Sequence, residues 1–159
     1  MALPQPQQAV RFRLLPMLAL CLIAFSSCRH KVKTYESNCD IDKDFVKISF
    51  KHLMDSLAQY DRQYVEVTGK YEEDKELSAL VSDGRSLDDT SANGLWVNFS
   101  QDCPLYLKGT HQGLFEYADG QFTQINNKSI TIRGVIDLHN RGSHNRCKAS
   151  IERVSLVKL

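Results

Sequence analysis

Two stretches of the chain share one pattern: Val65-Glu66-Val67-Thr68-Gly69-Lys70-Tyr71 and Ile130-Thr131-Ile132-Arg133-Gly134-Val135-Ile136. Apolar and polar residues alternate in both, which predicts strands with one buried face. Each also places a glycine on its apolar face. A glycine inside an otherwise strong strand is typical of a bulge or of a sharp bend in a coiled sheet. Two coiled strands predict a small closed barrel.

Three further segments are compatible with strands: 77–81, 95–99 and 149–159. The last of them breaks strict alternation, so we expect a bulge within it. Residues 101–127 are mixed, with Pro104 and several glycines, and we expect them to include a short helix that closes one end of the barrel. The sheet therefore has five predicted strands.

An amphipathic helix is predicted before the first strand of the barrel, over residues 50–59. Ser49 occupies an N-cap position, and apolar residues follow it at the spacing i, i+3, i+4, i+7 and i+8: Phe50, Leu53, Met54, Leu57 and Ala58. This spacing places the apolar side chains on one face of the helix, so that face is expected to pack on the core.

Three strands, an irregular insert and two more strands follow the order of the oligonucleotide/oligosaccharide-binding (OB) fold. The segments Tyr64-Val65-Glu66-Val67-Thr68-Gly69, Gly94-Leu95-Trp96-Val97 and Ile132-Arg133-Gly134 resemble small uncharacterised bacterial envelope proteins with an OB-like barrel, a likeness that spans roughly residues 50–159. The resemblance implies the fold and no agreed activity. We predict a mainly β chain with a five-stranded OB-like barrel. A six-stranded sandwich or another small barrel is the alternative.

The N-terminal segment has the composition of an export signal. Arg11 and Arg13 precede an apolar run over residues 14–25, which is shorter than the roughly 20 residues that span a bilayer. Ala24-Phe25-Ser26 is compatible with cleavage that releases a soluble protein beginning at Ser27.

Phe25-Ser26-Ser27-Cys28 instead resembles the lipobox of bacterial lipoproteins, with Phe25 where leucine is usual. This resemblance implies acylation of Cys28 with palmitate-type chains, and two or three such chains hold a protein stably on a membrane. We therefore predict a signal peptide over 1–27, a tether over 28–46 and the barrel domain over 47–159. The implied location is the bacterial cell envelope, on a membrane and facing the periplasm.

The charge balance argues against a general binder of nucleic acid. The chain has 20 Lys and Arg against 19 Asp and Glu, a net charge of +1, whereas proteins that neutralise phosphates are usually visibly basic. Residues 72–76 contain four carboxylates, which would repel a phosphate backbone at the edge of the predicted barrel. We expect no nucleic-acid partner, and a single-stranded nucleic-acid binder is kept as a second alternative.

Three cysteines remain beyond the signal and Cys28, and an oxidising compartment would favour a disulfide among them. One disulfide among Cys39, Cys103 and Cys147 allows three pairings. Cys39 with Cys103 is favoured, because Cys103 closely follows a predicted strand and Cys39 lies in the lead-in to the domain.

The loop between the last two predicted strands is the candidate binding region, because the corresponding loop of OB barrels borders the ligand face. Arg141 and Arg146 are candidate contacts for carboxylate or phosphate groups, and His139 and His144 are candidate donors. The alternative is a solvated polar loop. A metal site or enzyme built on His139, His144 and Cys147 is a further alternative, although their spacing matches no established zinc pattern.

These observations predict a membrane-anchored envelope lipoprotein that acts as a non-catalytic binding module. Its partners would be the membrane, through the lipid on Cys28, and an envelope protein, a cell-wall component or a small anionic ligand. No nucleophile elbow, Walker loop or His-Glu-x-x-His motif occurs in the chain. We therefore predict no catalytic residues and no cofactor.

Overall fold

The computed structural model describes residues 32–82, 93–116 and 123–159, which belong to one compact unit. The predicted signal and Cys28 lie outside the described residues. None of the helices in the described segments has the length and apolar content needed to cross a membrane.

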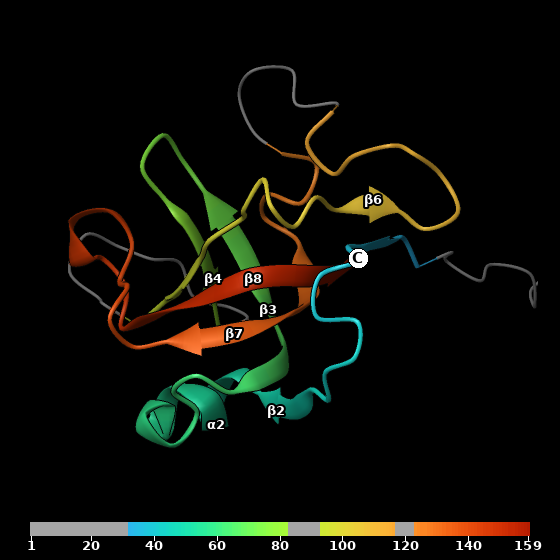
Figure 1. The fold of residues 1–159 in the computed structure, drawn as a ribbon. Helices are drawn as coiled ribbons and strands as arrows, with labels where there is room; N and C mark the ends of the chain where they lie inside the picture. The colour runs from blue at the N-terminus through green and yellow to red at the C-terminus, as the bar shows by residue number, and fades with distance from the viewer. Residues whose placement is uncertain (1–31, 83–92, 117–122) are drawn as a thin grey trace, which may run out of the picture. The chain divides into compact units, whose positions relative to one another are not determined.

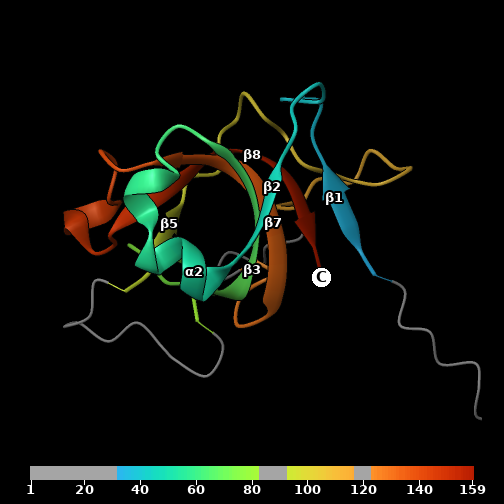
Figure 2. The same cartoon turned by 90° about the horizontal axis from the view of Figure 1, so that it is seen from below.

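Five strands form a closed barrel (Figures 1 and 2): β3 (Tyr64–Glu73), β4 (Ser78–Val81), β5 (Leu95–Val97), β7 (Ser129–Asp137) and β8 (Ala149–Lys158). Around the barrel the order is β3-β4-β5-β8-β7, and β7 returns to β3. The β5–β8 pair is parallel, whereas the other four pairs are antiparallel. The predicted five-stranded OB-like barrel is confirmed.

The alternation in the two glycine-containing strands matches their burial. In β3 and β7 the apolar positions face inward and form much of the core, among them Val65, Val67, Ile130, Ile132 and Ile136. The two strands pair along their length, with Gly69 opposite Ile130 and Gly134 opposite Val65. Their side chains therefore form a continuous apolar interior.

Both glycines lie where the backbone of another strand passes closely. A Cβ atom at Gly134 would lie 2.5 Å from the carbonyl oxygen of Glu152 on β8, and one at Gly69 would lie 2.9 Å from that of Val81 on β4. The register between β7 and β8 shifts beside Gly134, where the β8 residues between Glu152 and Leu156 form a bulge. The bulge expected in the last strand is present, and Arg153 within it has a positive φ of 49°.

The predicted helix begins at the expected residue, Phe50, but its α-helical part ends at Asp55, before the expected end at Gln59. Ser49 accepts a hydrogen bond from the backbone N–H of His52 and caps α2 (Phe50–Asp55), and a 3₁₀ turn (Leu57–Gln59) follows. The helix buries Phe50 and Leu53 against the core. It connects β2 (Val46–Ser49) to the parallel strand β3, and its Phe50 ring lies beside Gly69 of that strand.

The described part of the segment predicted as a tether, residues 32–46, contains a strand that packs on the barrel. β1 (Thr34–Glu36) pairs with the C-terminal half of β8, and the short β6 (Tyr106–Leu107) pairs with β1. Tyr35 is fully buried between them. Residues 34–49, which we name the strap, therefore add two strands to the barrel domain. β1 and β2, with three and four residues, are too short to show a period in the sequence. Their contacts with β8 and β3 therefore determine that these segments form strands.

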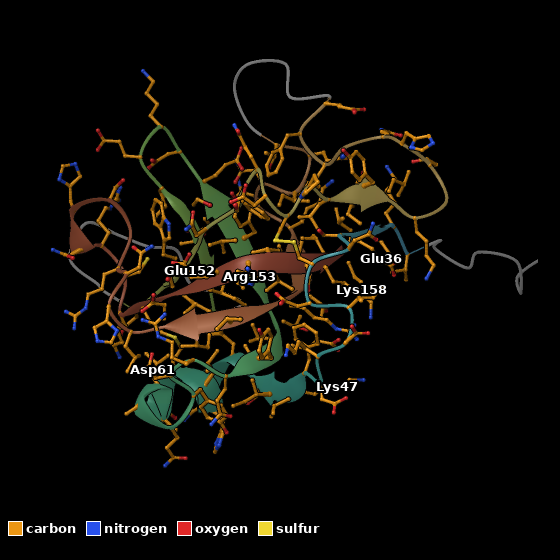
Figure 3. All side chains as sticks on the ribbon, viewed as in Figure 1. Glu36, Lys47, Asp61, Glu152, Arg153 and Lys158 are labelled. Atoms are coloured by element: carbon orange, nitrogen blue, oxygen red, sulfur yellow. A yellow bond between two sulfur atoms is a disulfide. The ribbon has the colours of Figure 1, made fainter. Side chains whose placement is uncertain are left out.

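Two side-chain links fix the strap to the rest of the domain, one to the insert after β5 and one to β8. Cys39 forms a disulfide with Cys103, drawn as a yellow bond in Figure 3. Asp40 accepts two hydrogen bonds from the guanidinium group of Arg153, at 2.9 and 3.0 Å. Arg153 lies in the bulge of β8, so the bulge turns this side chain outward toward the strap (Figure 3).

The insert between β5 and β7 differs from the expectation of a helix. In the part of 101–127 that the structure describes, the backbone forms turns, β6 and a hairpin in which the N–H of Leu107 donates to Gln112 and that of Leu114 donates to Leu105. Gly109, with φ of 78°, turns this hairpin. Proline and glycine at close intervals favour turns over a helix.

Residues 32–159 contain all the described strands, the disulfide and both described apolar clusters. The core draws on every strand of the barrel, on α2 and on the strap. A chain of this size buries enough surface to fold by itself. We therefore treat residues 32–159 as an independently folding domain.

Candidate functional site

The predicted binding loop, residues 139–148, faces the acidic loop that joins β3 to β4. The Nε2 atom of His144 lies 3.6 Å from a carboxylate oxygen of Glu76, and a guanidinium nitrogen of Arg146 lies 3.8 Å from a carboxylate oxygen of Asp74. These two loops border the ligand face in OB barrels. Arg146 and His144 therefore each lie beside a carboxylate of the acidic loop. Together with His139, which contacts Asp137, three of the four predicted ligand contacts have a partner within the chain.

The tip of the same loop packs on Trp96 in β5. A Cβ atom at Gly142 would lie 2.1 Å from the indole ring, and the φ of Gly142 is 73°, a conformation that favours glycine. On its other side the half-buried indole contacts a small cluster of Leu77, Ala79 and Cys147. Trp96 therefore packs beneath the loop, which covers part of the outer face of β5.

A network around Glu152 fixes the base of the loop. The carboxylate of Glu152 accepts hydrogen bonds from Asn98 at 2.6 Å, from Asn140 at 2.7 Å and from the hydroxyl of Ser150 at 2.7 Å. The side-chain oxygen of Asn140 accepts from the backbone N–H of Gly142 at 3.0 Å. This network connects β5, β8 and the loop. No short-range pattern could have revealed it, because Asn98 and Glu152 are 54 residues apart.

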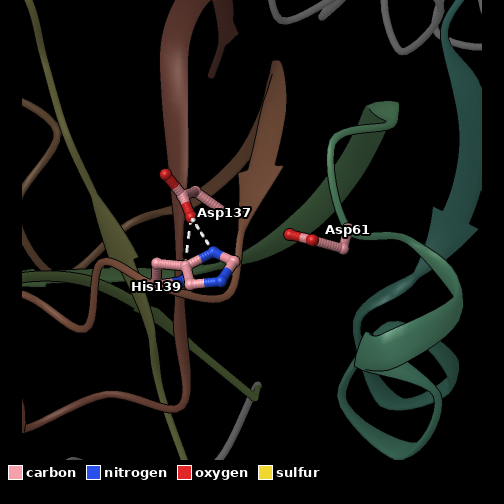
Figure 4. A group of neighbouring side chains, drawn as sticks. All are labelled: Asp61, Asp137 and His139. Atoms are coloured by element: carbon pink, nitrogen blue, oxygen red, sulfur yellow. Dashed lines mark hydrogen bonds and ion pairs between the residues drawn. The ribbon is translucent and has the colours of Figure 1, made fainter.

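His139 joins the only group of three potential metal ligands in the described residues, together with Asp61 and Asp137 (Figure 4). Asp137 accepts hydrogen bonds from the backbone N–H of His139 at 2.8 Å and contacts its Nδ1 at 3.3 Å. Asp61 accepts from the backbone N–H of Leu138 at 3.1 Å. Both carboxylates therefore terminate β7 and shape the turn that follows it.

The electrostatics of this group oppose a cation. Arg62 lies 3.1 Å from the second carboxylate oxygen of Asp137, so a positive charge already occupies this position. The backbone hydrogen bond from His139 and the nearby Arg62 hold the pKa of Asp137 below its ordinary value. With its oxygens engaged by these donors, the group fits the role of a turn-forming cluster better than that of a metal centre.

The structure does not bring together the alternative metal set of His139, His144 and Cys147. In the described part of the chain, His139 contacts Asp137, His144 contacts Glu76, and Cys147 lies buried beside Trp96. Burial raises the pKa of the Cys147 thiol to about 11, so it is a poor thiolate donor near neutral pH.

Three of the four predicted contact residues, His139, Arg141 and His144, are exposed to solvent, whereas Arg146 is half-buried. Within the described segments the Arg141 side chain makes no hydrogen bond or ion pair, whereas its backbone carbonyl accepts from the N–H of Cys147. Arg141 is thus a cation held on a fixed backbone and available for an external contact.

Comparison with protein-family models found no match for this chain, and comparison with curated proteins and with solved structures found none either. The OB-like barrel is therefore established by strand order and register alone.

Proposed function

We propose that this chain is a lipid-anchored protein of the bacterial envelope, whose OB-like barrel is a non-catalytic binding module. The observation that carries the proposal is the disulfide between Cys39 and Cys103. Disulfides persist in oxidising compartments such as the periplasm and are rare in the cytosol. The disulfide thus agrees with the export signal before Cys28, and it joins the segment nearest the anchor to the barrel.

The ordered strap makes the link to the proposed anchor short. Only residues 29–33 separate Cys28 from Thr34, the first residue of β1. An extended chain spans at most about 3.6 Å per residue, so Thr34 would stay within roughly 20 Å of an acylated Cys28. In this proposal the barrel works at the membrane surface, and it does not reach far into the periplasm.

The proposed contact surface is loop 139–148, where Arg141 and His139 are exposed. An anionic group on a partner protein, a cell-wall component or a small ligand would pair with Arg141. The Glu152 network and the Gly142–Trp96 contact hold the backbone of the loop in place, which lowers the entropy lost on binding.

Intact-mass spectrometry and membrane fractionation of the native product test the proposal. We expect a mature chain that begins at Cys28, carries the mass of a diacylglycerol and an additional acyl group, and stays with the membrane. Cys28→Ala should abolish this mass and release or mislocalise the protein, whereas the control Cys147→Ser should leave both unchanged. An unacylated product that begins at Ser27 in the aqueous fraction would refute the anchor.

A further inference from the structure

A hollow of about 600 Å³ lies between the segment after β5 and the hairpin that carries β6. It shares no residue with loop 139–148. Its wall is apolar and rich in aromatic rings, with Phe99, Leu105, Tyr106, Leu114 and Phe115 among the lining residues. Pockets for small molecules typically have volumes of about 300 to 1,000 Å³ and apolar, aromatic walls.

A row of aromatic rings supports one wall of this pocket. Phe115 packs edge-to-face on Phe99, with 5.1 Å between ring centroids, and Phe99 packs in the same way on Tyr71 at 6.0 Å. Tyr71 is buried in the core, where its hydroxyl shares a hydrogen bond of 3.0 Å with Ser78. The row therefore runs from the barrel interior to the pocket rim and orients Phe115.

The opposite wall is fixed by covalent and backbone bonds. Cys103 lines the pocket and is joined to the strap by the disulfide. The backbone N–H of Leu114 donates to the carbonyl of Leu105 at 2.9 Å, which closes the hairpin across the pocket. The walls are thus formed before a ligand enters, so binding would cost little ordering.

Two aromatic side chains at the rim are exposed to water. Tyr106 is 43% exposed and Phe115 is 45% exposed, and they are two of the five large hydrophobic residues that are exposed in the described segments. Isolated exposed hydrophobic residues are common, whereas these two line the same apolar hollow, so both present apolar surface to one site. A ligand that covers both rings would remove this surface from water.

The charged side chains that line the pocket and its neighbouring hollow are acidic in the described part of the chain. Among the described lining residues of the pocket, Glu116 is the one with a charge. A smaller hollow of about 250 Å³ adjoins it, sharing Pro104 and Tyr106, and its charged residues are Glu36 and Asp102. Lys108 pairs with Glu36 at 3.2 Å but lines neither hollow. An anionic ligand would meet carboxylates without a cation in the described lining, whereas a cationic one would be attracted.

We propose that this pocket binds a small apolar or aromatic molecule that is neutral or positively charged. The site lies beyond the binding role proposed for loop 139–148, and it does not depend on the lipid anchor. Two features define its selectivity: the exposed rings of Tyr106 and Phe115 select for an apolar body, and the carboxylate of Glu116 selects against negative charge.

Two fluorescent probes that differ by one charge test both features on the oxidised domain 32–159. N-phenyl-naphthylamine is neutral, and anilinonaphthalene sulfonate has the same ring system with an added sulfonate. We expect saturable binding of the neutral probe and about fivefold weaker binding of the sulfonate, because one like charge a few ångströms away costs on the order of 1 kcal/mol. Absence of saturable binding of the neutral probe, or equal affinity for the two, would overturn the proposal.

Variants locate the binding. Phe115→Ala and Tyr106→Ala should each weaken binding of the neutral probe by about tenfold, because each removes one aromatic face. Glu116→Gln should leave the affinity for the neutral probe unchanged and raise the affinity for the sulfonate probe to nearly the same value. Val46→Ala, an exposed apolar residue of β2 outside the pocket, is the matched control and should change neither. Equal loss in the control, or no loss in either aromatic variant, would refute the assignment. Circular dichroism verifies the fold of each variant.

Discussion

Substitution of Gly134 by alanine tests whether the barrel closes through close contact between β7 and β8. The added methyl group would lie 2.5 Å from the carbonyl oxygen of Glu152 and 2.7 Å from the side chain of Ile151. Backbone has to move by about an ångström to restore normal contact, and overpacking of this kind costs about 1 to 3 kcal/mol. Alanine also restricts the unfolded chain more than glycine does, which offsets up to about 1 kcal/mol of this loss in the free energy of unfolding. We expect a net loss of about 2 kcal/mol.

Two other glycines calibrate this value. Gly109 has a φ of 78°, but a Cβ atom added there would have no heavy atom within 4 Å, so Gly109→Ala reports backbone strain alone, about 1 kcal/mol. Gly69 is intermediate, because its Cβ would lie 2.9 Å from the Val81 carbonyl oxygen. Urea denaturation of the domain, followed by the fluorescence of the single tryptophan, Trp96, measures all three. If Gly134→Ala costs no more than Gly109→Ala, the close-contact explanation of the bend is wrong.

Three further predictions concern the links and the buried thiol. Cys39→Ser with Cys103→Ser should destabilise the domain by about 4 kcal/mol in urea denaturation, because the disulfide closes a loop with a sequence separation of 64; an unchanged midpoint would contradict this. The hydrogen bond from Arg153 lowers the pKa of Asp40 in the folded chain below its value of about 4 in the unfolded chain. The Asp40–Arg153 pair therefore stabilises the fold in full above about pH 4, and this stabilisation is lost as the pH falls through the pKa of Asp40 in the folded chain. Asp40→Asn should therefore cost about 1 kcal/mol at pH 7 and less at pH 3. Cys147, with a pKa of about 11, should resist thiol reagents at pH 8 until urea unfolds the domain; rapid labelling of the folded protein would show that it is accessible.

Local patterns were sufficient to predict the strands of the barrel. The alternation around Val65 and Ile132 is visible within seven residues, and the faces it predicts are those that the structure buries. The glycine interpretation also succeeded, because the close approach of β8 leaves no room for a side chain at Gly134, and the residue type itself records this requirement. Features with a local physical cause are the ones that a single sequence reveals.

The strap and the insert depend on distant partners. Thr34–Glu36 is too short to show a period, and it becomes a strand because β8 offers a free edge and the core accepts Tyr35. β6 likewise requires β1 beside it. The pocket beside β6 follows from the same contacts, so its residues gave no signal beyond scattered aromatic positions. Only the pairing of Cys39 with Cys103, favoured from the sequence, pointed toward this arrangement.

The polar loops show how two segments that are far apart in the sequence come to partner each other. The sequence indicates a repulsive edge for the acidic loop and a ligand contact for loop 139–148, and the structure pairs the two, in line with a predicted topology that places both beside one face. Their pairs, His144 with Glu76 and Arg146 with Asp74, span 3.6 and 3.8 Å, and every side chain in them except the half-buried Arg146 is exposed, so each pair contributes at most about 1 kcal/mol. The packing of Gly142 on Trp96 and the Glu152 network must therefore hold the loop. An anion that binds here gains Arg141 without displacing either pair, whereas one that requires Arg146 has to compete with a carboxylate already in place.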